Sequence, residues 1–367
     1  MAEKCFICTT PYQIIAASAI ELEMRFHADL LIVPQFSGAE AYAERARNTG
    51  IFSNVLCVDT SEIEAYKKRK NRLLYGLGIV KNYVFLDRIV KSMIGETVYK
   101  TVYISSQANI GRLISIYCSK RGAEIVFFDD GEGSYDNSKI YEAQGIDRLI
   151  RSFFFGKKSI GFSNKRKLYF PELYRNVYSD KDDVQKIMNW AENRSFLDCM
   201  NDICGYSADA QISEKYVLID TIPSESFDSD GAERYEKLRA LCADSLGEQM
   251  IVKKHPRDKS ECISSVKVYP FSSIPFEIIC ANSDIGDKVL ITAASTAVFI
   301  PKMLFDSEPV VIMLHRITGS RFNNSAEREK MIDQIRALYR DPGRIVIPES
   351  IAEFEEILQA ETNSIKA

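Results

Sequence analysis

Residues 123–135 read Ala-Glu-Ile-Val-Phe-Phe-Asp-Asp-Gly-Glu-Gly-Ser-Tyr, an apolar run that meets two carboxylates and then a glycine-rich turn. A continuous apolar run bounded by turn residues is typical of a strand buried on both faces, as in a parallel sheet. Ligands of open α/β sheets bind beyond the carboxyl ends of such strands. Asp129 and Asp130 are therefore expected at a sheet edge where a ligand can bind.

These two carboxylates can be interpreted in two ways. Neighbouring carboxylates repel, so the pKa of one should be raised, and a raised pKa suits a proton acceptor that works near neutral pH. The alternative is that Asp130 only begins the turn at Gly131. The stretch taken alone favours the turn, and the choice depends on the remainder of the chain.

Length and composition limit the class of protein. At 367 residues the chain is longer than a single hydrophobic core usually supports, so two domains are expected. The net charge is −4, whereas nucleic-acid-binding proteins normally carry an excess of basic residues. No signal-peptide pattern and no apolar run of membrane-spanning length are found, so a cytoplasmic protein is expected. Nine scattered cysteines indicate reduced thiols, and three widely separated histidines argue against a zinc site.

The amino-terminal part alternates strand and helix patterns, as a parallel α/β layer structure does. Strands are expected at 4–9, 29–34, 54–58, 101–105 and 123–129, and helices near 12–24, 38–48, 60–70, 77–94 and 108–120. Residues 139–212 show no clear strand period and are expected to form helices and long connections.

The alternation restarts at about residue 213. Strands are expected at 216–220, 249–253, 265–269, 288–292, 309–313 and 344–347, and helices near 232–246, 274–282, 296–305, 325–340 and 350–360. The chain is therefore predicted to form two Rossmann-like α/β domains facing across a cleft, at 1–212, with the irregular extension 139–212, and at 213–367. A cleft between domains is a preferred ligand site.

Several polar side chains should gather at the carboxyl edge of the first sheet. Thr10 and Gln13 fit a helix capping box around Pro11, which explains them structurally. The same box places Thr10 and Gln13 at the edge where Asp130 emerges. Ser105 and Gln107 end another strand at that edge, so these residues are candidates for the acceptor side of a site.

The second half contains a histidine in a basic setting. His255 follows a strand and is held in extended geometry by Pro256. The neighbouring cations, Lys253, Lys254 and Arg257, should lower the pKa of His255 until an anion such as phosphate binds. A histidine at a strand end is more often structural, but the basic cluster favours phosphate binding.

Two further positions could contact a nucleotide. Ser295 or Thr296 caps a helix after a turn of small residues, which is either an anion site or an ordinary N-cap. Glu277 lies in the first turn of a helix that begins near Pro275, where it could accept ribose hydroxyls or only complement the helix dipole.

Other motifs favour structural interpretations. Asp228-Ser229-Asp230 has the D-x-D form of a metal-dependent sugar transferase, but the helix that follows makes N-capping the simpler explanation. The segments 67–75, 153–158 and 165–167 combine basic with apolar residues. Solvated helix faces are favoured for each, with peripheral contact to the inner membrane as the alternative.

The motifs together resemble those of the bacterial sialyltransferases. That group shares an acidic pair before glycine, a His-Pro pair and a later Ser-Ser or Ser-Thr pair, and here these read Asp129-Asp130-Gly131, His255-Pro256 and Ser295-Thr296. The opening Thr10-Pro11-Tyr12-Gln13 and the continuation after Gly131 look most like glycosyltransferase family 52, the lipooligosaccharide and capsule sialyltransferases.

The resemblance implies a GT-B fold and an inverting, metal-independent transfer from CMP-sialic acid, without a further cofactor, to a hydroxyl of a bacterial surface glycan. It implies that Asp130 is the general base and that His255 is the acid for the departing CMP phosphate. Ser295 and Thr296 would hold that phosphate, and Glu277 the ribose.

Two other functions stay open at this point. One is a transferase of the same fold that uses another nucleotide sugar. The other is a non-catalytic glycan- or nucleotide-binding protein of capsule assembly. The oligomeric state is open as well, with a homodimer as one possibility.

Overall fold

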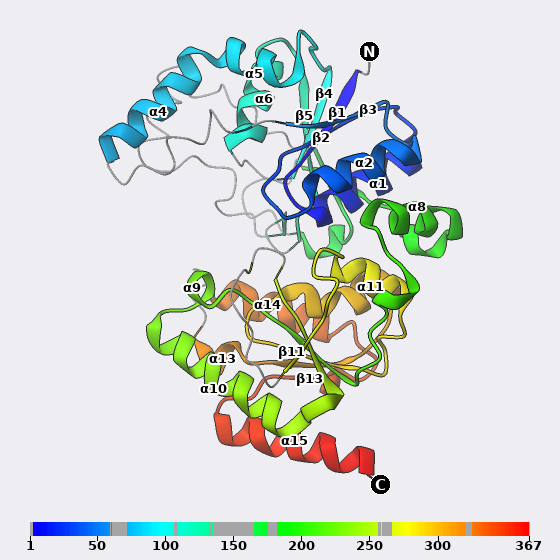
Figure 1. Ribbon diagram of the computed structural model, residues 1–367, viewed down its shortest axis with the longest axis vertical. Helices are drawn as coiled ribbons and strands as arrows, with labels where there is room; N and C mark the ends of the chain where they lie inside the picture. Colours follow the sequence, from blue (N-terminus) through cyan, green and yellow to red (C-terminus); the bar gives the residue numbers. More distant parts are fainter. Residues whose placement is uncertain are drawn as a thin grey trace. The chain divides into compact units, whose positions relative to one another are not determined.

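The computed structural model describes residues 3–58, 60, 72–105, 109–131, 134–135, 165–174, 182–255, 258, 266–319 and 325–366. The chain divides into two compact units, Met1–Gly205 and Tyr206–Ala367. Each unit is an α/β layer structure built on one parallel sheet (Figure 1). The sequence-based division lay at 212/213.

The sheet of the first unit contains seven parallel strands in the order β3-β2-β1-β4-β5-β6-β7. Its strands are β1 (Lys4–Cys8), β2 (Asp29–Ile32), β3 (Asn54–Cys57), β4 (Thr101–Ile104), β5 (Glu124–Phe128), β6 (Lys165–Leu168) and β7 (Asp183–Lys186). The strand order reverses direction between β1 and β4, and open sheets bind ligands at such a switch point. The five strands expected in this half are confirmed.

Helices cover both faces of this sheet: α1 (Pro11–Met24), α2 (Ala39–Thr49), α4 (Arg72–Val84), α5 (Leu86–Ile94) and α6 (Asn109–Ser119). A further helix, α8 (Arg194–Cys204), packs against α1 and α2. Helices α1 and α2 lie on one face and α5 and α6 on the other (Figure 1). The single helix expected at 77–94 is instead two, α4 and α5, with a break at Phe85. The helix expected at 60–70 lies almost wholly outside the described residues.

Strand alternation explains why both faces are apolar. Cys5 and Ile7 of β1 belong to the core beneath α5 and α6. Phe6, between them, faces the other way and stacks on Tyr103 with a ring separation of 4.5 Å. Successive strand side chains point to opposite faces, so a strand covered on both sides needs a continuous apolar run.

The prediction that 139–212 contains no strand was wrong. Strands β6 and β7 extend the first sheet within this segment. Strand β6 is Lys-Arg-Lys-Leu, and its Arg166 is only 7% exposed because it pairs with Asp182 (3.4 Å) and lies over the rings of Phe127 and Tyr174. Residues 165–167 are thus part of a strand in which Arg166 and Lys167 are buried and Lys165 is partly exposed, and they do not form a helix face.

The second unit repeats the same order with six parallel strands, β10-β9-β8-β11-β12-β13. They are β8 (Tyr216–Ile219), β9 (Met250–Lys253), β10 (Lys267–Val268), β11 (Val289–Thr292), β12 (Val310–Met313) and β13 (Ile345–Val346). The helices are α9 (Pro223–Ser226), α10 (Ser229–Leu246), α11 (Phe276–Asn282), α12 (Ile300–Phe305), α13 (His315–Thr318), α14 (Ser325–Arg336) and α15 (Ile351–Lys366). All six expected strands are present.

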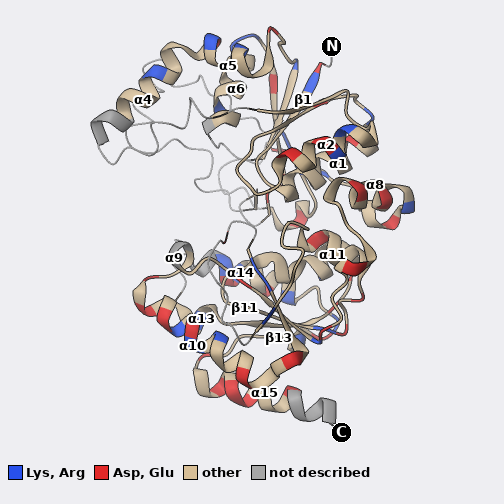
Figure 2. Cartoon of the chain, in the orientation of Figure 1, with Lys and Arg blue, Asp and Glu red and all other residues tan. Residues whose placement is uncertain are grey.

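Helices α10, α13 and α15 pack on one face of this sheet, opposite α11 and α14 (Figure 1). Helix α15 buries Phe354 and Leu358 and exposes the acidic residues Glu353, Glu355 and Glu356 (Figure 2). This amphipathic spacing made the helix at 350–360 predictable.

Short 3-10 turns complete the chain at Pro171–Leu173, Trp190–Glu192, Ala208–Ala210, Gly247–Gln249, Thr296–Phe299 and Pro342–Arg344. Within the described part of the chain, no helix combines the length and apolar character that crossing a membrane requires.

Candidate active site residues at two sheet edges

Asp129 follows β5 and is fully buried, and its carboxylate accepts four hydrogen bonds. Its Oδ1 accepts from the Tyr12 hydroxyl (3.0 Å) and the Gly131 N–H (2.8 Å). Its Oδ2 accepts from the Tyr169 N–H (3.0 Å) and from the Tyr135 hydroxyl. Burial raises the pKa of Asp129, and these four donors oppose the rise. A carboxylate with four donors organises the strand end and has little capacity left to accept a substrate proton.

Asp130 has a different environment. Its Oδ1 accepts from Nε2 of Gln13 at 2.6 Å, and its backbone N–H donates to the Ser134 hydroxyl at 2.6 Å. Burial raises the pKa of Asp130 to about 6, the charge of Asp129 adds to the rise, and the Gln13 hydrogen bond opposes it. A carboxyl with this pKa is ionised at neutral pH yet is a better base than an exposed aspartate.

The predicted capping box is half correct. Thr10 is the N-cap of α1 and its hydroxyl accepts from the Gln13 N–H at 3.3 Å. The Gln13 side chain does not return to the N–H of Thr10. Its Oε1 accepts from the N–H (2.5 Å) and the hydroxyl (3.1 Å) of Thr9, which leaves its Nε2 for Asp130. The structure therefore joins Thr10, Gln13 and Asp130 in one hydrogen-bonded group.

The remaining candidates of the first unit lie at the same edge or outside the described residues. Ser105 follows β4, is 2% exposed, and its hydroxyl meets no hydrogen-bond partner within the described part of the chain. Gly131 adopts a φ of 84°, a left-handed conformation that favours glycine. Gln107 lies outside the described residues.

In the second unit, β9 leads directly into the basic cluster. Lys253 is buried, which lowers its pKa to about 8, with the Glu277 charge opposing this fall. Lys254 pairs with Asp258 at 3.4 Å, and the backbone carbonyl of His255 accepts from the Asp258 N–H at 2.9 Å. His255 is half-buried at the strand end, as expected, and Pro256 lies outside the described residues. Part of the predicted positive charge is thus neutralised by Asp258.

Glu277 lies in the first turn of α11, where the sequence placed it, and is 8% exposed. Burial raises the pKa of Glu277, and the nearby Lys253 charge opposes the rise. This position complements the helix dipole and also presents a carboxylate beside the end of β9, so both interpretations of Glu277 remain consistent with its geometry.

Ser295 caps the turn Thr296–Phe299, because its hydroxyl oxygen accepts from the Ala297 N–H at 3.3 Å. The turn is tied to the sheet by Thr292, which accepts from the Ser295 N–H at 3.0 Å and donates to the Ile219 carbonyl at 3.0 Å. The helix expected at 296–305 is a 3-10 turn followed by the six-residue α12. Such short elements carry a small dipole, so an anion here would depend on hydroxyl and N–H groups.

Sequence reasoning missed a buried arginine beside this turn. Arg328 of α14 is 5% exposed and donates from Nη2 to the Ala294 carbonyl at 2.7 Å. It occurs in the charged run Ala326-Glu327-Arg328-Glu329-Lys330, where no signal distinguishes it from a solvated residue.

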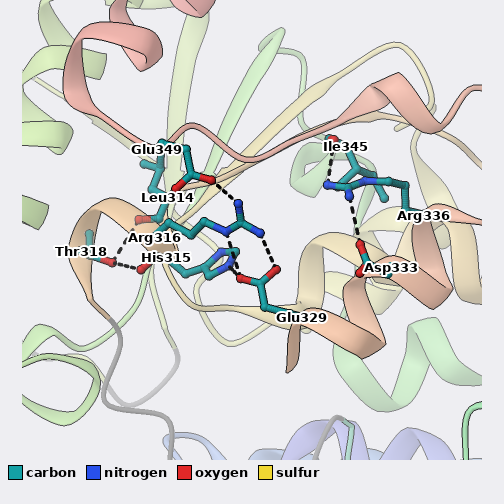
Figure 3. A network of polar contacts seen from close by, with 9 residues as sticks. All are labelled: Leu314, His315, Arg316, Thr318, Glu329, Asp333, Arg336, Ile345 and Glu349. Carbon is teal, nitrogen blue, oxygen red and sulfur yellow. Dashed lines mark hydrogen bonds and ion pairs between the residues drawn. The ribbon is translucent and has the colours of Figure 1, made fainter. Parts of the chain in front are cut away.

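A polar network lies next to it, at the end of β12 (Figure 3). Glu329 accepts from His315 Nε2 (2.8 Å) and from Nη2 of Arg316 (2.9 Å), and Arg316 also pairs with Glu349. Burial lowers the pKa of His315, and Glu329 opposes this. The network anchors α13 to α14 and thereby the helix that carries Arg328.

The N-cap expected at the D-x-D motif is confirmed. Asp228 is the N-cap of α10, and its Oδ1 accepts from the Gly231 N–H at 2.8 Å. Among the described residues no group of three or more His, Cys, Asp or Glu side chains is arranged to hold a metal ion.

Residues 4–315 match the model of a protein family described as alpha-2,8-polysialyltransferase (POLYST). No curated protein matches the chain.

Solved structures of similar fold include a glycotransferase of kitacinnamycin, with 8% identity and a TM-score of 0.52 over 95% of this chain and 87% of that one. A UDP-GlcNAc 2-epimerase from Methanocaldococcus jannaschii has 11% identity and a TM-score of 0.51, over 97% of this chain and 92% of that one. A putative UDP-N-acetylglucosamine 2-epimerase from Listeria monocytogenes has 10% identity and a TM-score of 0.50, over 94% and 92%. These likenesses show the fold, two Rossmann-like domains of GT-B type.

Proposed function

This chain belongs to the alpha-2,8-polysialyltransferase family, and from that premise we propose that it transfers sialic acid from CMP-sialic acid to a hydroxyl of a bacterial surface glycan. The family makes it a sialyltransferase-type glycosyltransferase, with a nucleotide-sugar donor and a glycan acceptor. The narrower resemblance to glycosyltransferase family 52 stays a prediction. So does the choice between lipooligosaccharide and capsule as the acceptor.

The observation that carries the proposal is the contrast between the two carboxylates that follow β5. Asp129 is occupied by four donors, whereas Asp130 receives one hydrogen bond from the described residues and has a pKa of about 6. In the proposed reaction Asp130 takes the proton of the acceptor hydroxyl. The acceptor oxygen then forms a bond to the anomeric carbon of sialic acid while the bond from that carbon to the CMP phosphate breaks. One displacement of this kind inverts the anomeric configuration.

The second unit supplies the proposed donor-side roles. The departing CMP takes the electron pair of the broken bond, and His255 donates a proton or hydrogen bond to its phosphate. Lys254 adds positive charge, the hydroxyls of Ser295 and Thr296 donate to phosphate oxygens, and Glu277 accepts from the ribose. Charge neutralisation by these side chains makes a metal ion unnecessary in this scheme.

The family description names an α-2,8 linkage. A terminal sialic acid on a glycan is therefore the first acceptor to test. A transferase that uses another nucleotide sugar is the alternative, because the similar folds include proteins described with UDP-GlcNAc.

Peripheral contact with the inner membrane belongs to the same proposal. Two of the segments that motivated it, 67–75 and 153–158, fall largely outside the described residues. Just after the first, α4 exposes Leu77 and Val84 together with Lys81, and Phe85 is exposed where α4 ends. A cytoplasmic location and a homodimer are further predictions.

Thermal unfolding with CMP, CMP-sialic acid, UDP and GDP in parallel tests the donor. A ligand at about 100 times its Kd stabilises the fold by about 2.7 kcal/mol, a rise in Tm of several degrees. Stabilisation by the two cytidine ligands alone supports the proposal. If UDP or GDP alone stabilises the fold, another nucleotide sugar is the donor. No shift with any nucleotide would favour a non-catalytic binding protein of capsule assembly.

A further inference from the structure

The side chain of Gln13 lies between the end of β1 and the end of β5 and is 1% exposed. On one side its Oε1 accepts from both donors of Thr9, the N–H at 2.5 Å and the hydroxyl at 3.1 Å. On the other side its Nε2 donates to Oδ1 of Asp130 at 2.6 Å. The amide thus connects the strand ends on either side of β4.

The orientation of this amide follows from its partners. A backbone N–H can only donate, so the Gln13 atom that faces Thr9 must be the carbonyl oxygen. The amino group must then face Asp130, where an ionised carboxylate is the matching acceptor. Thr10 holds the Gln13 backbone at the helix start, since its hydroxyl accepts from the Gln13 N–H.

We propose that Gln13 is a positioning residue for sialyl transfer, which holds Oδ1 of Asp130 and favours its ionised form, so that Oδ2 is presented to the acceptor hydroxyl. Thr9 acts through Gln13 by preventing the amide from turning over. This inference rests on the proposed function of Asp130 as the general base. It assigns Gln13 to the base and not to contact with the acceptor.

The environment of Asp130 creates a need for such a donor, because the nearby hydroxyls of Tyr12 and Tyr135 donate to Asp129. Burial raises the pKa of Asp130, and the charge of Asp129, adjacent in the chain, raises it further. The Cys8 thiol at the end of β1 also lies within electrostatic range. Among the described residues, Gln13 is the group that lowers the pKa of Asp130. Asp130 is also held through its backbone, by the N–H bond to Ser134.

Two substitutions test the proposal in the full-length protein. Gln13→Leu removes the amide donor. Gln13→Glu keeps an acceptor for Thr9 but replaces the donor with a second carboxylate, so it offers a variant of unchanged size if Gln13→Leu does not fold. In both, the pKa of Asp130 is expected to rise by about one unit or more. The acid limb of kcat/KM against pH should move up with it.

The carboxyl pKa can be measured without turnover, by ¹³C NMR titration of aspartate carboxyl signals. The Asp130 signal is identified by its loss in Asp130→Asn. The matched control is Gln185→Leu, because Gln185 is an exposed glutamine whose Nε2 lies 3.5 Å from the Asp183 carboxylate. Neither the Asp130 signal nor the rate profile should move in this control.

The outcomes separate the inference from the function on which it rests. A pKa and a rate profile that both shift upward in the Gln13 variants support the inference. An Asp130 pKa that stays in place in both variants overturns it. A pKa that moves while the profile stays fixed also overturns the positioning role, because Asp130 is then not the base. Absence of sialyl transfer in the wild-type protein defeats the proposed function, whereas the titration still tests the Gln13 hydrogen bond.

Discussion

Asp129 and Asp130 are neighbours in the chain, yet within the described residues Asp129 accepts four hydrogen bonds through its carboxylate and Asp130 accepts one. The backbone places the first carboxylate into the core and leaves the second partly accessible. An acidic pair that looks uniform in sequence therefore separates into an organising residue and a candidate base.

Stability should distinguish the two residues. Asp129→Ala removes the carboxylate that accepts from four donors, some of which keep other partners, and a buried donor that stays unmet costs about 1–3 kcal/mol. We expect the free energy of unfolding to fall by about 2–4 kcal/mol, measured by urea denaturation. Asp130→Ala is the matched control and should cost less than about 1 kcal/mol while abolishing transfer. Equal losses of stability in the two variants would contradict this division.

The pKa of Asp130 predicts a pH dependence of activity. A general base must be ionised, so kcat/KM should fall below about pH 6, as Asp130 becomes protonated. The fall should approach tenfold per pH unit. A pH–rate profile measured from pH 4.5 to 8 checks this, and a profile that stays flat down to about pH 5 would show that Asp130 behaves as an exposed aspartate.

The raised pKa of Asp130 also predicts how stability depends on pH. The sign is opposite to that of an aspartate whose pKa is lowered by folding. The pKa of Asp130 is raised from 3.8 in the unfolded chain to about 6, so between these values the folded state binds more protons. Raising the pH through this window therefore destabilises the fold, by roughly 2–3 kcal/mol. Asp130→Asn should remove this contribution. The measurement is the difference in unfolding free energy between wild type and variant at pH 4 and pH 7.

Arg328 offers a test of the donor side. Arg328→Met removes the bond to the Ala294 carbonyl and loosens the turn that carries Ser295 and Thr296. The KM for the donor should rise roughly tenfold, the equivalent of about 1.4 kcal/mol, with a smaller change in kcat. Arg336→Met is the matched control, since Arg336 of the same helix bonds the Ile345 carbonyl (3.4 Å), near the other end of α14 (Figure 3). Similar KM values in both variants would remove Arg328 from the donor site.

Metal independence can be tested directly. The D-x-D aspartate Asp228 is used as a helix cap, so EDTA should leave transfer unchanged within about twofold. Loss of activity in EDTA and its recovery with a divalent ion would instead make Asp228 and Asp230 candidate ligands.

The central strands could be predicted because buried parallel strands carry continuous apolar runs, as β5 does with Ile125 to Phe128. Strand β6 could not, because Arg166 and Lys167 are buried although their sequence is that of a charged surface. The rings of Phe127 and Tyr174 and the carboxylate of Asp182 make this burial tolerable, and none of them is adjacent to Arg166 in sequence.

The position of the candidate site was predictable in the same way, because strand ends place Asp130 and His255 at sheet edges. The side-chain contacts within the site could not be predicted from the sequence. The Gln13 side chain appeared to complete a capping box, and only the pairing of β4 with both β1 and β5 brings it to Asp130. Arg328 lies in a helix whose charges look solvated, and its burial against the turn at Ala294 depends on tertiary structure alone.

The most direct test of the account is transfer from CMP-sialic acid to a sialylated glycan by wild type and by Asp130→Asn, with CMP binding followed in both by its effect on Tm. We predict that the variant loses transfer by at least about 10²–10⁴-fold, the usual contribution of a general base, and still shows the full CMP-dependent rise in Tm. Transfer retained by Asp130→Asn at the wild-type rate would contradict the assignment of Asp130 as the base.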